Sequence, residues 1–173
     1  MRKLFEFPNP VNEVSARLVA GGVVLLTLVI MVGGQHWAIA LLAYGFLARV
    51  LTGPTLSPLG QFVTRVLTPN LPFPEKLVAG PPKRFAQGIG ATLSTTAAVL
   101  YFGFGATTPA LVLVAMITVA ASLESILGFC LGCVMFAQLM KVGVVPESVC
   151  VDCADIWSRI DRDAERASEP AVA

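Results

Sequence analysis

The chain has 173 residues, of which 55% are hydrophobic and only 13% are charged, and its mean hydropathy is +0.77. A soluble domain of this length could not bury so much apolar surface in one core, so the composition excludes an ordinary soluble protein and indicates a membrane protein. The formal net charge is +1 and no basic stripe runs along the chain, which excludes nucleic-acid binding as a main function.

The first half of the chain contains two apolar segments that predict a helical hairpin. Crossing about 30 Å of hydrocarbon takes about 20 helical residues. We expect a first span at residues 14–32 and a second at residues 37–52, joined by a glycine-rich turn at residues 33–36. No charged residue lies between Arg17 and Arg49. Both segments can therefore lie in lipid.

A proline-rich connection follows the second span, from LTGPTLSPLG to TPNLPFPEKLVAGPPKR. Five apolar residues in it recur at helical spacing with polar residues opposite, and this pattern predicts a short helix that lies in the membrane surface. A proline-stiffened loop without a helix is the alternative. The five apolar residues are Leu59, Phe62, Val63, Val66 and Leu67.

The third span is expected at residues 85–104. The fourth begins near Pro109 and stays apolar as far as Met140, with Glu124 as the only charged residue within it. This fourth segment is longer than one crossing requires. It must therefore tilt strongly, emerge into the interface or break inside.

Basic residues cluster near the N-terminus and in the middle connection, whereas the two turns that join the predicted hairpins contain no Lys or Arg. Because positive charge marks the cytoplasmic side, both termini should be cytoplasmic. We therefore predict an all-α membrane protein with four transmembrane helices. Residues 1–145 would form the integral membrane domain, and residues 146–173 a cytoplasmic, cysteine-containing tail with a short helix.

The four cysteines form two C-x-x-C pairs, Cys130 with Cys133 and Cys150 with Cys153. Buried packing, reversible dithiol chemistry and metal ligation all fit this pattern. The spacing is within the range of a zinc site and an iron–sulfur cluster could use the same ligands, but the first pair grows from a membrane helix, where zinc knuckles do not normally lie. Acidic residues surround the second pair, which suits a relay or ligand role. In a reducing cytoplasm a permanent disulfide is the least expected state.

The first pair can react only if its helix is interrupted. In a continuous helix the β-carbons of Cys130 and Cys133 would be about 5 to 6 Å apart, which exceeds the roughly 3.5 to 4.5 Å that a disulfide needs. Gly128 and Gly132 could permit a local break, so that Cys130 would begin a new helical segment. Alternatively, the two glycines could form a G-x-x-x-G face that packs closely on a neighbouring helix.

Glu124 is expected in hydrocarbon, where a carboxylate is costly without a partner. Arg49 in the second span lies at comparable depth by the helical rise, so we predict a buried ion pair between Glu124 and Arg49. In a functional alternative, Glu124 is the proton acceptor for Cys130 or Cys133, or a residue on a substrate pathway.

Four motifs of the chain resemble an uncharacterised bacterial membrane family, domain of unknown function 4395. They are FPNPVNE near the start, LTGPTLSPLGQ after the second span, FAQGIG opening the third and LESILGFCLGCVMF in the fourth. The resemblance covers residues 5 to about 145. It implies a four-helix fold, multi-pass in the bacterial plasma (inner) membrane, with no established activity. Because members are encoded near thioredoxin-like and rhodanese-like proteins, it also implies thiol or sulfane-sulfur chemistry.

From these observations we expect a membrane-embedded thiol protein that handles electrons or sulfane sulfur, with Cys130 and Cys133 as the working pair and Glu124 as a proton acceptor. The second pair would relay to a cytoplasmic thioredoxin-like or rhodanese-like partner, and the enzymatic class would be thiol–disulfide oxidoreductase. A second copy of the chain, in a homo-oligomer, is a further possible partner. One alternative function is a non-enzymatic scaffold or accessory subunit whose C-x-x-C only packs a helix interface. Another is a small sulfur-anion transporter lined by Arg49 and Glu124.

Overall fold

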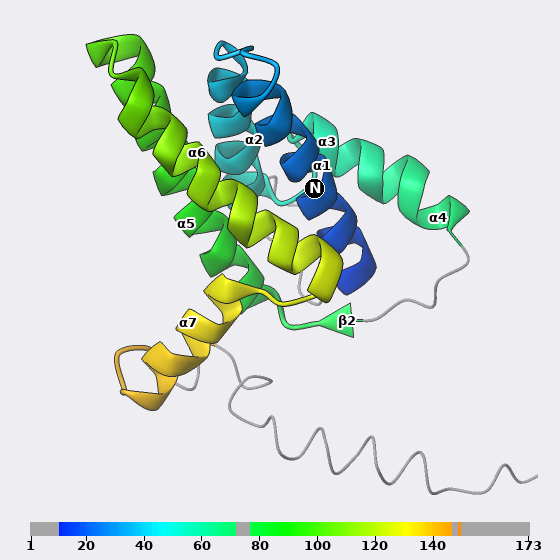
Figure 1. The fold of residues 1–173 in the computed structure, drawn as a ribbon. Coiled ribbons are helices and arrows are strands. Elements are labelled where there is room, and N and C mark those ends of the chain that lie inside the picture. The colour runs from blue at the N-terminus through cyan, green and yellow to red at the C-terminus, as the bar shows by residue number, and fades with distance from the viewer. Residues whose placement is uncertain (1–10, 72–76, 147–148, 150–173) are drawn as a thin grey trace, which may run out of the picture.

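The computed structural model describes residues 11–71, 77–146 and 149, and within these the chain is almost entirely helical, as predicted (Figure 1). The long helices are α1 (Glu13–Met31), α2 (Ala38–Thr52), α5 (Gly80–Ala98) and α6 (Thr107–Ser122). The shorter helices are α3 (Pro58–Phe62), α4 (Thr68–Asn70) and α7 (Leu131–Lys141). Five-residue π-helical segments continue α3, α5 and α6, namely η1 (Val63–Leu67), η2 (Val99–Gly103) and η3 (Leu123–Leu127). Strand β1 (Val11–Asn12) pairs antiparallel with β2 (Leu77–Val78).

The four long helices form a bundle in which each contacts two neighbours. Helix α1 contacts α2 and α6, and α5 also contacts α2 and α6, so the order around the bundle is α1, α2, α5, α6. The turn between α1 and α2 and the turn between η2 and α6 lie at the same end, at the top of Figure 1, while β2 and α7 lie at the other. At the turn end the rings of His36 and Tyr101 meet edge to face, with centroids 5.4 Å apart.

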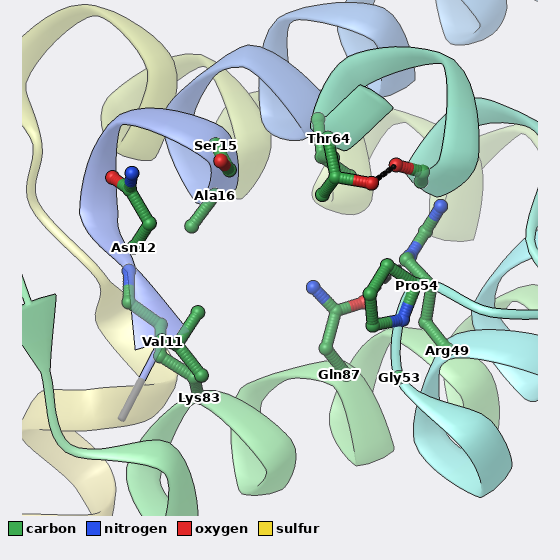
Figure 2. Close-up of a pocket in the computed structure, with 12 residues that line it drawn as sticks. Val11, Asn12, Ser15, Ala16, Arg49, Gly53, Pro54, Thr64, Lys83 and Gln87 are labelled. Atoms are coloured by element: carbon green, nitrogen blue, oxygen red, sulfur yellow. Dashed lines mark hydrogen bonds between the residues drawn. The ribbon is translucent and has the colours of Figure 1, made fainter. Parts of the chain in front are cut away.

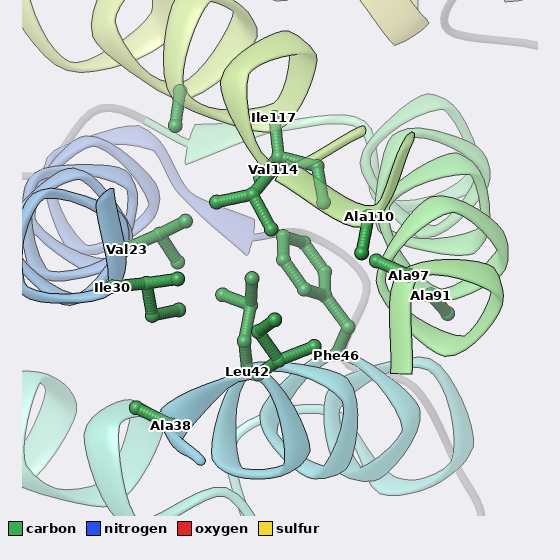
Figure 3. Close-up of a cluster of buried hydrophobic side chains, with 12 residues drawn as sticks. Val23, Ile30, Ala38, Leu42, Phe46, Ala91, Ala97, Ala110, Val114 and Ile117 are labelled. Atoms are coloured by element: carbon green, nitrogen blue, oxygen red, sulfur yellow. The ribbon is translucent and has the colours of Figure 1, made fainter. Parts of the chain in front are cut away.

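An apolar core holds the bundle together (Figure 3). Every long helix contributes deeply buried residues to it, among them Ile30 of α1, Leu42 of α2, Ala97 of α5 and Val114 of α6. Helices α2 and α5 approach closely where the Phe46 ring lies over Gly90. A Cβ atom added at Gly90 would overlap this ring. Glycine at this position is therefore a packing requirement.

The outer surface of the bundle is also apolar. Leu25 of α1 and Val119 of α6 are 68% and 60% exposed. Helix α1 and the continuous helix Thr107–Leu127, formed by α6 and η3, are each long and apolar enough to cross a membrane. Helix α2 is apolar but has only 15 residues. Of the four predicted spans, two therefore meet the length and hydropathy that a crossing needs.

The middle connection forms the predicted short helix, which runs through α3, η1 and α4. Ser57 caps its start, since the Oγ atom accepts a hydrogen bond from the N–H of Gly60 at 3.2 Å. Leu59 packs on α1, where its side chain fills the space beside Gly22. Phe62 is 53% exposed on the outer side. The helix thus lies on the bundle with one face and leaves an apolar residue on its surface.

The third helix begins at Gly80 rather than at residue 85. Pro81 stands in its first turn, where the missing N–H group has no helical partner to lose. The prolines before Phe85 therefore start this helix instead of preventing it. As a result Lys83 and Arg84, which the sequence placed in a loop, lie on α5.

The fourth predicted segment is broken, which decides among the three explanations for its length. The helix formed by α6 and η3 ends at Leu127, Gly128 has a φ of +70°, and α7 begins at Leu131. Beyond the break α7 leaves the direction of α6 and packs on α5, at the lower left of Figure 1. The apolar segment is therefore two helices joined at an angle.

Substitution of Gly90 tests the packing between α2 and α5. Gly90→Ala should destabilise the protein by about 1–3 kcal/mol, because the methyl group displaces the Phe46 ring. Gly88→Ala is the matched control on the same helix, since a Cβ there meets nothing within 4 Å. Alanine has the higher helix propensity, so this control should be neutral or up to about 1 kcal/mol more stable. Thermal unfolding in one detergent measures both, and equal midpoints would contradict the packing.

Candidate functional site

A glycine and an arginine close the helix break. Gly128 adopts the left-handed conformation, and its N–H donates to the carbonyl oxygen of Glu124 at 3.1 Å. Arg17 of α1 donates from Nη2 to the carbonyl oxygen of Ile126 at 2.8 Å, and from Nε and Nη2 to that of Ser125 at 3.3 Å. The last carbonyl groups of a helix lack partners within it, and a cation is favourable beside them. The break is therefore stabilised by a tertiary contact with α1.

The first cysteine pair lies at the start of α7 and forms a disulfide. Cys130 is the N-cap residue, in an extended conformation, and its Sγ accepts a hydrogen bond from the N–H of Cys133 at 3.3 Å. The two Cα atoms are 5.2 Å apart, within the usual range for a disulfide. Cys130 is 9% exposed and Cys133 is partly exposed. A permanent disulfide was the state least expected for the cytoplasm. The disulfide seen here is also one of the two states of a reversible dithiol.

The two glycines of the predicted G-x-x-x-G face have separate structural roles. Gly128 makes the break, whereas Gly132 allows α7 to approach α5, because a Cβ at Gly132 would lie 2.5 Å from the Cβ of Ala86. Farther along α7, the ring of Phe136 packs against Phe85 with centroids 5.6 Å apart. The helix break and the close helix packing, which were alternatives for this glycine pair, therefore both occur, each at one glycine.

A cavity of about 250 Å³ lies beside the start of α7. Four of the predicted site residues line it together, namely Arg49 of α2, Glu124 of η3, Cys130, and Gly132 of α7. Most of its other lining is apolar and comes from α1, α5 and α6. Cys133 is not among its lining residues. The fold thus brings the buried arginine, the acid and the first cysteine to one space.

The predicted ion pair between Glu124 and Arg49 is wrong, since Glu124 pairs with Lys83. The Nζ atom of Lys83 lies 2.5 Å from Oε1 of Glu124, and both side chains are largely buried. Arg49 donates from Nε to the Oε1 atom of Gln87 at 3.0 Å instead. Because α5 begins before residue 85, Lys83 lies on the helix, four positions before Gln87 and on the same face. The lysine thus reaches the carboxylate that the prediction assigned to Arg49.

Arg49 is 6% exposed, and its hydrogen-bond partners among the described residues are neutral, whereas Glu124 acts on its charge from across their shared cavity. Its Nη1 atom donates to Oγ of Ser57 at 3.5 Å, and its guanidinium carbon lies 4.5 Å from the centre of the Phe46 ring. No carboxylate oxygen of the described residues lies within 4.0 Å of its nitrogen atoms. With Lys83 and Gln87, Arg49 also lines a second cavity of about 210 Å³ (Figure 2). Arg49 therefore borders both cavities.

Sequence reasoning missed several residues of this site. The four-residue spacing of Lys83 and Gln87 is a signal that could have placed both on one helical face. Ser57 directly before Pro58 is typical of a helix start, with a capping hydroxyl followed by proline. No sequence pattern relates Arg17 to helix carbonyls more than 100 positions away. Its role depends on the tertiary fold alone.

The predicted metal alternatives depend on residues that the structure does not describe. Among the residues described, no group of three or more His, Cys, Asp or Glu side chains could hold a metal ion. Cys150 and Cys153, the predicted relay or ligand pair, lie outside the described residues, as does the predicted tail helix. A four-cysteine zinc or iron–sulfur site therefore stays an untested alternative.

A family model described as Domain of unknown function (DUF4395) matches residues 11–141. The match runs from β1 to the end of α7, so it includes the helix break, the disulfide and both cavities. It confirms the resemblance carried by the four motifs. No curated protein and no solved structure matches the chain.

A double-mutant cycle tests the ion pair. Glu124→Gln and Lys83→Gln should each destabilise the protein by about 1–3 kcal/mol, because each leaves one charge without its partner. The double variant should recover at least about 0.5 kcal/mol of the summed loss. A cycle of Glu124→Gln with Arg49→Gln should give the smaller coupling, since these residues form no ion pair. Unfolding in detergent measures all variants, and a stronger coupling to Arg49 would contradict the structure.

Gly128→Ala tests whether the break controls the disulfide. A Cβ at this left-handed position costs about 1–2 kcal/mol, and only the reduced chain can escape that cost by forming a continuous helix. At a fixed ratio of reduced to oxidised dithiothreitol, the disulfide fraction should therefore fall. The measurement is a maleimide gel shift in a chain whose Cys150 and Cys153 are changed to serine.

Gly143→Ala is the matched control for this experiment. Gly143 has a φ of +80° with nothing within 4 Å of its added Cβ, but it lies after α7 and away from the disulfide. Gly143→Ala carries the same backbone cost as Gly128→Ala, but it should leave the fraction of chains with the disulfide unchanged. An equal fall in both variants would show that general destabilisation, not the break, sets the equilibrium.

Proposed function

We propose that this chain, which belongs to the DUF4395 family of unknown function, is a membrane-embedded thiol–disulfide oxidoreductase that exchanges electrons or sulfane sulfur with a cytoplasmic thioredoxin-like or rhodanese-like partner. One observation carries the proposal. The Cys130–Cys133 disulfide stands at the start of a helix, beside a cavity that is also lined by the carboxylate of Glu124.

The proposed location is the bacterial plasma membrane, with α1, α2, α5 and α6 as four spans and both termini in the cytoplasm. The apolar outer faces of the bundle support this location. Charge supports the orientation, because basic residues lie at the starts of α1 and α5 and at the end of α7, whereas the two turns at the opposite end contain no Lys or Arg. The disulfide would then lie near the cytoplasmic boundary.

The two sulfur atoms suit different tasks. Cys133 is partly exposed, so a sulfur atom of a partner protein can reach it. Cys130 is nearly buried and already accepts a backbone N–H at the start of α7. A thiolate in that position is stabilised by the N–H groups and the dipole of the helix. We therefore assign Cys133 as the sulfur that contacts the partner and Cys130 as the leaving group.

Electron transfer would proceed by thiol–disulfide exchange. A partner thiolate attacks Sγ of Cys133, the bond to Cys130 breaks, and its electron pair goes to Sγ of Cys130. A second partner thiolate attacks the mixed disulfide and releases Cys133, so that two electrons have moved from the partner to this chain. Glu124 exchanges the proton of Cys130 across the shared cavity, and Lys83 holds the carboxylate in position.

Sulfane-sulfur transfer would use the reduced pair. The thiolate of Cys133 attacks the outer sulfur of a partner persulfide, and the partner leaves as a thiolate. The thiolate of Cys130 then attacks Sγ of Cys133, expels hydrosulfide and forms the disulfide. The persulfide supplies the oxidising equivalents, and a thioredoxin-like dithiol restores the reduced pair. Cys150 and Cys153 would relay between this site and the partner.

A non-enzymatic scaffold is the second candidate function. The close approach of Gly132 to Ala86 favours it, since a disulfide that only fixed the start of α7 would also serve this packing. The sulfur-anion transporter stays a further hypothesis, supported only by the presence of Arg49 and Glu124 on one cavity.

Trapping of a mixed disulfide tests the thiol function. In a chain with Cys150→Ser and Cys153→Ser, the added change Cys130→Ser should trap a single-cysteine thioredoxin variant on Cys133. This thioredoxin is supplied as its mixed disulfide with 5-thio-2-nitrobenzoate, which is the leaving group, so that neither protein holds a second thiol to resolve the complex. Cys133→Ser should trap roughly tenfold less, since access controls the rate of exchange and Cys130 is nearly buried. Non-reducing gel electrophoresis and mass spectrometry measure the adducts.

The control is the variant with all four cysteines changed to serine, which should trap nothing. In inverted membrane vesicles, a membrane-impermeant maleimide should label reduced Cys133 from the cytoplasmic side. Absence of adducts from variants that keep the parental thermal midpoint would reject the exchange reaction and favour the scaffold. Labelling from the outer side alone would reject the proposed orientation.

A further inference from the structure

Arg49 carries a buried positive charge that the thiol chemistry does not use. Lys83 is the second largely buried cation beside it, and the carboxylate of Glu124 is ion-paired with that lysine. The cluster of these three side chains therefore has one positive charge in excess. Gln87, Ser57 and the Phe46 ring orient the guanidinium without neutralising it. A buried charge is costly unless an opposite charge pairs with it.

The cavity of about 210 Å³ has room for that opposite charge (Figure 2). Arg49 and Lys83 both line it, and none of the described residues on its lining is acidic. The Nη2 atom of Arg49 has no hydrogen-bond partner among the described residues, so it is free to donate into this space. A water molecule takes about 30 Å³ of liquid, so the cavity can hold a small polyatomic ion together with water.

We propose that Arg49 and Lys83 form a binding site for a small tetrahedral oxyanion in this cavity. An oxyanion offers several acceptor oxygens, which suits a cavity lined by donors from both α2 and α5. Guanidinium and ammonium groups make strong, charge-assisted hydrogen bonds to such oxygens. Asn12, Ser15 and Thr64 add polar atoms to the lining. Cys130 and Glu124 do not line this cavity, so the site is separate from the disulfide.

The oxyanion has two sources of the same chemistry, a free anion in the cytoplasm and the phosphate of a lipid headgroup. The test uses the full chain in a detergent free of phospholipid. Sodium sulfate, sodium phosphate and short-chain phosphatidylglycerol are each titrated against sodium chloride at equal ionic strength, and the thermal midpoint is measured. A ligand that binds only the folded chain raises the midpoint with its concentration. We expect saturable stabilisation by at least one of the three.

Three variants locate the site. Arg49→Gln should weaken the apparent affinity about tenfold or more, as loss of a charged hydrogen bond requires. The double variant Lys83→Gln with Glu124→Gln should also weaken the apparent affinity about tenfold or more, and it leaves no carboxylate unpaired. If Arg49→Gln does not fold, this double variant tests the proposed site by itself. Arg84→Gln is the matched control, because Arg84 is exposed, adjacent to Lys83 in sequence and absent from the cavity lining.

The outcomes separate the sources and the functions. Stabilisation by sulfate or phosphate alone identifies a free anion, and stabilisation by the lipid alone identifies a headgroup. Stabilisation no greater than that by chloride, or equal responses in the parental chain and the variants at Arg49 and Lys83, overturns the proposal. The variant Cys130→Ser with Cys133→Ser should keep the response, so the anion site and the thiol function can fail independently.

Discussion

The contact between Arg17 and the end of the helix formed by α6 and η3 is the constraint on which the candidate site depends. A helix that ends inside a protein leaves carbonyl groups without partners, and here the guanidinium of α1 takes those of Ser125 and Ile126. Only because the helix ends there can Cys130 become the N-cap of α7 and bond to Cys133. A purely local feature, a C-x-x-C disulfide, thus depends on a contact between the first and the fourth long helix.

The buried charges follow from the same arrangement of helices. The early start of α5 places Lys83 opposite Glu124, and this pairing leaves Arg49 to neutral partners at the border of two cavities. One cavity adjoins the disulfide and contains an acid, and the other contains cations without an acid among its described lining. The first of these two neighbouring spaces is the one for which we propose proton exchange, and the second is the one for which we propose a bound negative charge.

Much of the fold was predictable because the signals are local. Apolar segments of helical length predict the hairpins, and the excess length of the fourth segment made a break, for which Gly128 and Gly132 were candidates, one of three alternatives. The partner of Glu124 was not predictable, because the helical rise estimates depth along one helix but not which residue of a neighbour faces it. Pro81 and Pro82 also read as a loop, which hid Lys83. The contact of Arg17 has no local signal, since it joins segments that are distant in sequence.

One turn of α5 carries three separate contacts of the site. Lys83 holds Glu124, Ala86 lies under Gly132 of α7, and Gln87 orients Arg49. A rotation of α5 about its own axis would change the ion pair, the seating of α7 and the direction of the guanidinium together. These three positions are therefore structurally coupled. Within the family, substitutions at them should occur together rather than one at a time.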